Sequence, residues 1–325
     1  MRHRPCAHLR VNSQRDPAVT AWLVCLLLLV PPQGRALDSS EVMPFGVRGL
    51  WVDLPVFSLF AQPGEPVQLE LPGPGTGKVR LLHRGEAFGK PGKGHWRMQA
   101  PAQPGLYPMR LEHPGTGQAT RLNLFVGYPV AAIDEAMLNG YRVGQLPPSH
   151  KKYPSLYRAP EAYFEVTPDN VDTLLTPHFT LRQFLCKQEA DYPKYLVLRE
   201  SLLLLLEGLV AAVRESGHAV DTLGVISGYR TPWYNKSIGN VSNSRHVYGD
   251  AFDFFVDVDG DGRMDDLDGS GQHDRGDVDR LAEIVDSFMR RPDNAALIGG
   301  MGRYYKTSRH GGFIHVDTRG FMARW

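Results

Sequence analysis

The sequence predicts an α+β domain, built from an antiparallel sheet with helices, preceded by a β-sandwich of immunoglobulin-like character. Three observations lead to this prediction. The chain has 325 residues, enough for two ordinary domains. Residues 41–130 contain short strand-like runs separated by Gly and Pro. From residue 177 onward, helical patterns are followed by short apolar runs rich in β-branched residues.

The β-rich half is assigned to residues 37–130. Its apolar or alternating runs are Leu50–Val56, Val67–Leu71, Val79–His83, Tyr107–Glu112 and Thr120–Val126. Short strands between turn signals are typical of a sandwich. This half contains no cluster of metal ligands or nucleophiles, so we expect an accessory domain and look for chemistry further along the chain.

A connector rich in Pro and Tyr is predicted for residues 131–176. Leu146-Pro147-Pro148 and Ala159-Pro160 block long regular elements, because proline has no backbone N–H and fixes its own φ. We expect this segment to drape over the second domain.

Regular elements are predicted again within residues 177–325. A largely apolar helix should span Tyr195–Ser216 and end at Gly217, and a buried strand should follow at Thr222–Ser227. A second helix should start with Asp277 as its N-cap and run to Arg290. Two final strands are expected near Ala296–Ile298 and Gly312–Asp317.

The N-terminal segment resembles a secretory signal. Arginines precede an apolar stretch from Ala18 to Val30, which small residues and prolines follow. This stretch is shorter than the roughly 20 apolar residues of a membrane span, although an uncleaved anchor is the alternative. We expect residues 1–36 to be removed, no stable membrane span to remain, and the protein to be exported to the periplasm or cell envelope.

Charge and cysteine content narrow the possibilities further. The formal net charge is +1, with 36 basic and 35 acidic residues, which provides no broad positive field for nucleic acid. Removal of the signal leaves Cys186 as the single cysteine, so no internal disulfide can form. Because Cys186 lies in an apolar run, we expect it to be a small buried hydrophobic residue rather than a nucleophile.

A metal site is suggested by His246 and Asp253, which lie seven residues apart around Gly249. Imidazole nitrogen and carboxylate oxygen both suit Zn²⁺, and catalytic zinc usually keeps three protein ligands and one water. His315, flanked by apolar residues in an expected strand, is a candidate for the third ligand. Composition alone does not select it from the other histidines.

Three motifs resemble the zinc D-Ala-D-Ala metallopeptidase superfamily. They are Ser227-Gly-Tyr-Arg230-Thr-Pro232, Ser244-x-His246-x-x-Gly249-x-Ala251-x-Asp253 and Phe313-Ile-His315-Val-Asp317. The resemblance spans roughly residues 177–325 and is greatest to the periplasmic murein endopeptidase branch. It implies that His246, Asp253 and His315 bind zinc and that Arg230 and Ser244 bind substrate.

The resemblance also implies a hydrolase that cleaves peptide bonds in peptidoglycan stem peptides or cross-links, as an endopeptidase or a carboxypeptidase. Zinc polarises a scissile carbonyl and lowers the pKa of a coordinated water from about 15.7 to about 7. The guanidinium of Arg230 can bind a substrate carboxylate with two parallel hydrogen bonds. A structural salt bridge is the alternative role for Arg230.

The sequence differs from some relatives at the position that supplies their general base. Several branches place Glu three residues before the last zinc histidine, but that position here is Gly312. Asp317 should share a strand face with His315, so it can act either on the zinc water or as the partner that orients the histidine. His310 is the other candidate for the base.

A calcium loop is predicted at residues 257–268. The spacing matches the twelve-residue EF-hand loop, with Gly262 at the turn. The expected ligands are Asp257, Asp259, Asp261, Arg263 through its carbonyl, Asp265 and Asp268. We regard the loop as a single structural site, and a solvated acidic turn is the alternative.

Two other functions fit parts of the sequence. Hedgehog signalling domains resemble this superfamily and bind zinc and calcium without turnover, so a non-catalytic cell-wall-binding or ligand module is one alternative. A peptidase that acts on ordinary proteins is another.

Overall fold

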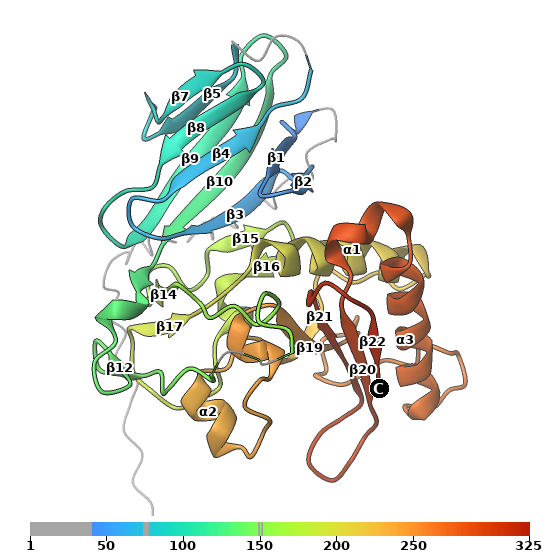
Figure 1. Ribbon diagram of the computed structural model, residues 1–325. Helices are drawn as coiled ribbons and strands as arrows, with labels where there is room; N and C mark the ends of the chain where they lie inside the picture. Colours follow the sequence, from blue (N-terminus) through green and yellow to red (C-terminus); the bar gives the residue numbers. More distant parts are fainter. Residues whose placement is uncertain (1–40, 74–77, 149, 151) are drawn as a thin grey trace, which may run out of the picture. The chain divides into compact units, whose positions relative to one another are not determined.

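The computed structural model describes residues 41–73, 78–148, 150 and 152–325 (Figure 1). The predicted signal at residues 1–36 lies outside the described residues. Within the described part of the chain, no helix is long and apolar enough to cross a membrane.

Two five-stranded sheets make up the N-terminal region (Figure 1). The strand orders are β2-β1-β4-β8-β7 and β3-β10-β9-β5-β6. The strands are β1 Phe45–Val47, β2 Leu50–Val52, β3 Val56–Ala61, β4 Pro66–Glu70, β5 Arg80–His83, β6 Glu86–Ala87, β7 Lys90–Gly92, β8 His95–Gln99, β9 Gly105–His113 and β10 Gln118–Val126.

Alternating burial explains why these segments form sheets. In β4, Val67 and Leu69 are buried between exposed neighbours, and in β8 Trp96 and Met98 repeat the pattern. Period-two alternation gives a strand one face for the core and one for solvent. Each of the five predicted runs overlaps a strand, but β1, β6, β7 and β8 were not predicted. The immunoglobulin-like β-sandwich stays a prediction.

β3 differs from the other strands because all six of its residues are buried. Its second face contacts the following region, where the Ser58 hydroxyl donates to the Leu175 carbonyl at 3.0 Å. The Phe60 N–H donates to a carboxylate oxygen of Glu200 at 3.1 Å. Strand β3 therefore joins the N-terminal sheets to the rest of the chain.

The predicted connector contains several short strands. They are β12 Met137–Leu138, β13 Tyr141–Arg142, β14 Ala162–Val166 and β15 Leu174–Thr176. Strand β11 Tyr128–Pro129 precedes this segment, and β16 Phe179–Thr180 and β17 Lys194–Leu196 follow it. β14 pairs with both β11 and β17, so pairing across the chain fixes this proline-rich stretch. The helix predicted to begin at Tyr195 begins only at Glu200, because Tyr195 and Leu196 lie in β17 and pair with β14.

The C-terminal region is built on a five-stranded sheet with the order β18-β19-β21-β20-β22 (Figure 1). All neighbours are antiparallel except β20 and β22. The elements are α1 Glu200–Glu215, β18 Gly224–Ser227, α2 Pro232–Ser237, the 3-10 turn η5 Arg245–Tyr248, β19 Ala251–Phe255, α3 Arg275–Met289, the 3-10 helix η6 Pro292–Leu297, β20 Gly300–Tyr304, β21 Phe313–Asp317 and β22 Ala323–Arg324.

Helices α1 and α3 pack together and form part of the core. They lie in close contact at Gly208, where a Cβ atom would lie 2.1 Å from the Phe288 ring. Any larger residue at that position would push the helices apart. In β21, Ile314 and Val316 are fully buried in this hydrophobic core, so alternation directs His315 and Asp317 to the other face of the sheet.

Two predicted boundaries are wrong. Helix α3 is capped by Asp274, whose carboxylate accepts the Gly276 N–H, while Asp277 is three residues further on and accepts the Asp274 N–H in return. Asp277 therefore completes a capping box rather than starting the helix. Residues 296–298 do not form a strand, because η6, with Pro292 in its first turn, extends to Leu297 and β20 begins at Gly300.

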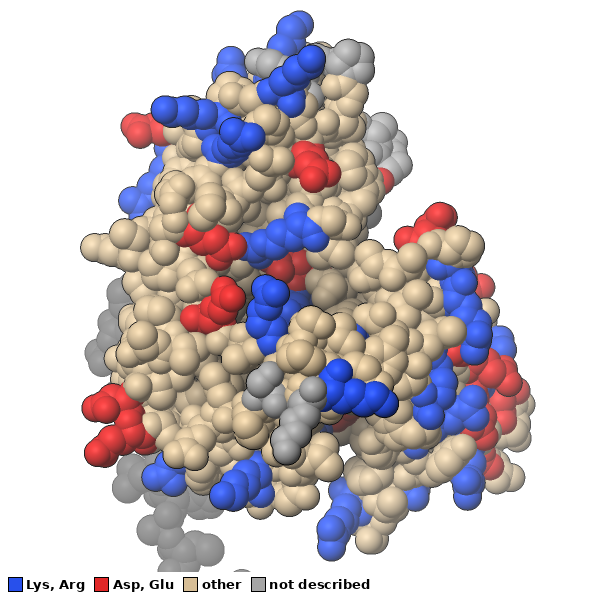
Figure 2. Space-filling model, in the orientation of Figure 1, with Lys and Arg blue, Asp and Glu red and all other residues tan. Residues whose placement is uncertain are grey.

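Two other predictions concern the burial of Cys186 and the distribution of surface charge. Cys186 is buried, at 3% exposure, as expected for a small hydrophobic residue. Basic and acidic side chains lie interspersed on the face drawn in Figure 2, in keeping with the near-zero net charge.

Candidate metal centre and substrate cleft

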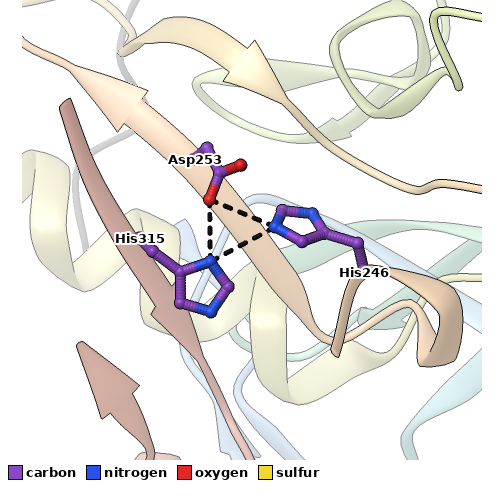
Figure 3. Close-up of side chains that lie close together, drawn as sticks. All are labelled: His246, Asp253 and His315. Atoms are coloured by element: carbon purple, nitrogen blue, oxygen red, sulfur yellow. Dashed lines mark hydrogen bonds and ion pairs between the residues drawn. The ribbon is translucent and has the colours of Figure 1, made fainter. Parts of the chain in front are cut away.

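Three side chains from separate elements converge at one point (Figure 3). His246 comes from η5, Asp253 from β19 and His315 from β21. His246 Nε2 lies 3.1 Å from Asp253 Oδ1 and 3.2 Å from His315 Nδ1, and the last two atoms are 2.7 Å apart. The three side chains predicted to bind zinc are thus the ones that the fold brings together.

The separations fit a tetrahedral ion. With zinc–ligand bonds of about 2.0 to 2.1 Å, two ligands of a tetrahedron lie about 3.3 Å apart. Two of the three observed separations are close to this value, and the shorter one needs a small relaxation. The donor set of two imidazoles and one carboxylate is a set that catalytic zinc uses.

Sheet register explains the placement of two ligands. Asp253 in β19 is directly opposite His315 in β21, and the same row continues to Ser227 in β18 and Gly302 in β20. Opposite residues have Cβ atoms about 4.5 to 5.5 Å apart, so their side chains meet on one face. Gly249, in the left-handed conformation at φ 72°, ends η5 and returns the chain to β19 after His246.

Each of the three side chains also makes a hydrogen bond through the atom that points away from the metal centre. The Nδ1–H of His246 donates to the Gly228 carbonyl at 2.7 Å, and the Nε2–H of His315 donates to Asp317 Oδ2 at 3.2 Å. The second oxygen of Asp253 accepts a hydrogen bond from Arg230. These bonds fix the tautomer of each ring so that the other nitrogen keeps its lone pair for a metal.

Arg230 is buried, at 9% exposure, and lines the cleft above the metal centre. Its Nε donates to the Ser227 hydroxyl at 2.8 Å and its Nη2 to Asp253. Nη1 has no hydrogen-bond partner among the described residues. Arg230 therefore forms the structural ion pair that was the alternative prediction, with Asp253, and also keeps Nη1 as a donor for a ligand.

Ser244 precedes η5 and lines the same cleft. It is nearly buried, at 8% exposure, and its side chain makes no cap hydrogen bond to η5. Its predicted role in substrate binding stays a prediction.

Asp317 is fully buried and its carboxylate is surrounded by donors. Oδ1 accepts from the N–H groups of Gly300 and Arg319 at 2.9 and 3.0 Å, and the Arg319 guanidinium contacts both oxygens. Burial alone would raise its pKa, but the hydrogen bonds from His315 and Arg319 hold that pKa well below its usual range. Such a carboxylate is suited to orient His315 and is a poor proton acceptor.

His310, the other candidate base, lies in the loop between β20 and β21 and lines the cleft. Its ring packs edge-on against Phe313, with centroids 5.2 Å apart, and is partly exposed. Its Nδ1 lies 2.8 Å from the Gly311 carbonyl, which leaves Nε2 without a partner in the described structure.

The cleft, of about 550 Å³, has an aromatic wall that the sequence did not reveal. Trp325 donates from Nε1 to the Tyr304 hydroxyl at 3.0 Å, and its ring lies 5.4 Å from that of His315. Gly302 permits this arrangement, because a Cβ atom there would be 2.4 Å from the indole nitrogen of Trp325. No local motif marks Trp325; it reaches the cleft because β22 pairs with β20.

The protonation of the metal-free trio follows from burial and proximity. Burial lowers the pKa of His246 despite the attraction of Asp253. Burial also acts to lower the pKa of His315, but hydrogen bonds to Asp253 and Asp317 outweigh it and raise that pKa to about 9. The pKa of Asp253 is far below its usual range because the two imidazoles outweigh its burial.

The predicted calcium ligands are distributed over two acidic groups. Asp257, Asp259 and Asp265 lie together, whereas Asp268 lies with Asp266 and Asp277. Asp261 and Arg263 belong to the first turn, where Asp261 Oδ1 accepts the Arg263 N–H at 2.8 Å. Asp268 is therefore not gathered with the ligands expected to share its ion.

The second acidic group repeats the first at an interval of nine residues. Asp257 accepts three N–H groups, from residues 260 to 262, and Asp266 accepts the corresponding three, from residues 269 to 271. The sequence carries the signal for this repeat in Asp266-x-Asp268-x-Ser270-Gly271, which aligns with Asp257-x-Asp259-x-Asp261-Gly262. The loop was expected to be single, and the structure shows two turns of the same kind.

Comparison with known families supports the chemistry of this centre. The family model described as Peptidase M15 matches residues 177–267, less than a third of the chain. The matched segment contains Arg230, His246 and Asp253 and ends before His315. The match confirms the resemblance to the zinc D-Ala-D-Ala peptidase superfamily and supports a metallopeptidase. No curated protein and no solved structure matches the chain.

Proposed function

We propose that the protein is an exported zinc peptidase that hydrolyses peptide bonds in peptidoglycan stem peptides or their cross-links. One observation carries this proposal: the converging atoms of His246, Asp253 and His315, each fixed from behind, lie in a cleft large enough for a peptide. The family match adds the peptidase chemistry, and the sequence resemblance adds the substrate. The predicted signal adds the cell-envelope location.

The residues of the cleft have distinct tasks in this proposal. Zinc held by the trio would polarise the scissile carbonyl and acidify a water. Arg230 offers Nη1 to an oxygen of the substrate, while its other nitrogens stay on Ser227 and Asp253. His310 receives a proton from the attacking water at its Nε2 and returns it to the leaving amine. Asp317 keeps His315 in the ligating tautomer.

A specific observation favours the non-catalytic alternative. Several relatives place Glu at the position of Gly312, and here a Cβ atom at Gly312 would lie 2.6 Å from Val278 Cγ2. A glutamate at this position requires Val278 or helix α3 to shift. The absence of this glutamate base fits a module that binds zinc and cell-wall peptides without turnover. If the chain is catalytic, His310 must supply the base instead.

Cleavage of cross-linked muropeptides decides between the two functions. The chain lacking residues 1–36 is incubated with purified cross-linked muropeptides, with zinc or after chelation, and the products are identified by mass. Zinc-dependent release of monomers is expected, and His246→Ala should abolish it. Binding of muropeptides without any zinc-dependent product would establish the module instead. Cleavage of an ordinary unfolded protein at equal rate would contradict the substrate assignment.

Calcium binding to the acidic turns is a separate proposal. Clustered carboxylates repel one another unless a cation or backbone N–H groups compensate them, and Asp265 has a raised pKa because of burial and of Asp259, Asp257 and Asp261. The turns connect β19, which carries Asp253, to α3. We expect millimolar Ca²⁺ to raise the melting temperature of the wild type but not of Asp257→Asn/Asp266→Asn. An equal response in both proteins would sink the proposal.

A further inference from the structure

A groove on the N-terminal sheets shares no lining residue with the metal cleft. It has a volume of about 620 Å³ and lies along β4, β7 and β8. The polar side chains that line it are Gln68, Lys90, His95, Arg97 and Gln99. Each of them can donate a hydrogen bond, and no acid is among the described residues that line the groove.

Sheet register places three of these side chains in one row. Arg97 in β8 is directly opposite Gln68 in β4 on one side and Lys90 in β7 on the other. Opposite residues share a face of the sheet, with Cβ atoms about 4.5 to 5.5 Å apart. All three are exposed, because alternation along β8 turns Trp96 and Met98 to the core instead. The row therefore faces solvent across three strands.

The row contains two like charges that lie opposite one another. Lys90 and Arg97 repel at this distance, and an anion between them would replace the repulsion by two attractions. Gln68 accepts the Nε–H of Arg97 at 3.1 Å. Both terminal nitrogens of the guanidinium have no partner among the described residues, so they can bind two oxygens of one group.

Glu70, an acid on the same face of the sheet, leans away from the groove. It is opposite His95 in β8 on one side and Gly46 in β1 on the other. Its carboxylate lies over β1, since a Cβ atom built on Gly46 would be 2.9 Å from Oε2. The charge that the groove itself offers to a ligand is therefore positive.

Positive charge is also concentrated in the strands around the groove. Residues 78–97 contain one acid, Glu86, and six basic residues, which are Lys78, Arg80, Arg84, Lys90, Lys93 and Arg97. The ion pairs of this region involve Arg48 and Arg110 instead. At the end of the molecule where β5 and β7 lie in Figure 1, the charged side chains drawn in Figure 2 are mostly basic. A positive field that extends beyond one groove fits a ligand with repeated anionic groups.

We infer that this face of the N-terminal sheets binds an acidic polymer of the cell envelope, with a phosphate or carboxylate group held between Arg97 and Lys90. The inference rests on the export that is part of the proposed function. It gives the N-terminal region a task of its own, which is to retain the protein at the envelope.

A lipid surface fits this face less well. Proteins that bind a bilayer surface combine basic side chains with apolar ones that enter the lipid. The large exposed apolar side chain among the described residues of these sheets is Trp51 in β2, and the strand order places β2 at the opposite edge from β7. The groove thus lacks an apolar neighbour that could insert.

Binding is measured with the His246→Ala form of the chain lacking residues 1–36, so the result does not depend on peptidase activity. The polymer probes are poly(glycerol phosphate) and polyglutamate, which repeat phosphates and carboxylates respectively. Vesicles that contain phosphatidylglycerol are the third probe. We expect a polymer to bind and its affinity to fall as the ionic strength rises, and the preferred polymer identifies the oxyanion. Tighter binding to the vesicles than to either polymer would overturn the inference.

Lys90→Ala/Arg97→Ala should weaken polymer binding about tenfold or more, because charge-assisted hydrogen bonds are lost. Arg121→Ala/Lys187→Ala removes the same charge from exposed positions outside the groove and should bind like the parent chain. Equal weakening in both double variants would reveal a response to net charge alone and would overturn the site.

Two further measurements exclude an effect of misfolding. The melting temperature of Lys90→Ala/Arg97→Ala should not decrease, because the substitutions remove two opposed like charges. Arg97→Lys keeps the charge without the planar fork, so its affinity should lie between those of the parent chain and the double variant. Failure of the wild type to cleave muropeptides would refute the peptidase and leave these binding results unchanged, so the two failures are distinguishable.

Discussion

His315 and Asp317, two residues apart in β21, are joined by a hydrogen bond of 3.2 Å from the imidazole Nε2–H to Oδ2 of the buried carboxylate. The other imidazole nitrogen faces Asp253 and His246. Because Arg319 and backbone N–H groups already occupy the remaining positions around Asp317, this carboxylate is committed to holding the ring. The first three predictions distinguish the orientation of a zinc ligand by Asp317, proton transfer by His310 and substrate contact by Trp325.

Asp317→Asn should weaken zinc binding about 10- to 100-fold, because an amide neither fixes the His315 tautomer nor carries the charge that supports it. At saturating zinc, kcat should change far less. Zinc affinity is measured by competition with a chelator and kcat by muropeptide cleavage. A large loss of kcat with unchanged zinc affinity would instead identify Asp317 as the general base.

His310→Ala should lower kcat about 10²- to 10⁴-fold while the zinc content stays the same, because a general base contributes about that much to turnover. Arg309→Ala, one residue earlier and exposed, serves as the control. Wild-type turnover in His310→Ala would require a base elsewhere in the cleft.

Trp325→Ala should raise KM several-fold with little change in kcat, because the indole contacts ground state and transition state alike. The 5.4 Å between the Trp325 and His315 rings is less than two residues of extended chain, so the contact involves a residue beside the scissile bond. Trp325→Phe should retain most of the affinity. Met322→Ala, equally exposed on the same segment but not lining the cleft, is the control. A similar rise in KM for Met322→Ala would argue against a specific contact between Trp325 and the substrate.

Zinc affinity should increase with pH up to about 9. Without metal the pKa of His315 is raised to about 9, so its ring is protonated at pH 7 and zinc must displace that proton. Affinity should change by about tenfold per pH unit between pH 7 and 9, with proton release measured by calorimetry in two buffers. Binding that is independent of pH over this range would contradict the assignment.

The same group affects stability in the metal-free protein. Its folded pKa lies above the ordinary value of 6.5, so its contribution is fully present below pH 6.5 and disappears as the pH rises towards 9. The melting temperature of the metal-free protein should therefore decrease over this interval. Zinc-saturated protein should not show this decrease, because the ring is then held neutral by the metal.

Local patterns in the sequence determined much of this protein. Alternating apolar residues marked strands such as β4 and β21, and the apolar helix before Gly217 was recognisable from its composition. His246 and Asp253 carried a ligand spacing, and together with Arg230 and His315 they matched motifs of a known superfamily. Each of these signals spans only a few residues of the sequence, so it can be recognised without knowledge of the fold.

Tertiary structure decided everything that depends on distant pairing. Tyr195 lies in β17 rather than in a helix because β14 supplies its hydrogen-bonding partners. Trp325 lines the cleft only because β22 adds to β20 beside Gly302, and His310 lies between two cavities, the metal cleft and one at the start of α3, formed by segments that are far apart in the sequence. From the sequence, Asp317 could serve either as the base or as the partner that orients His315, and only the structure shows that Arg319 and Gly300 surround it. Burial and the surrounding donors set the proton affinity of a carboxylate, and the sequence alone does not show them.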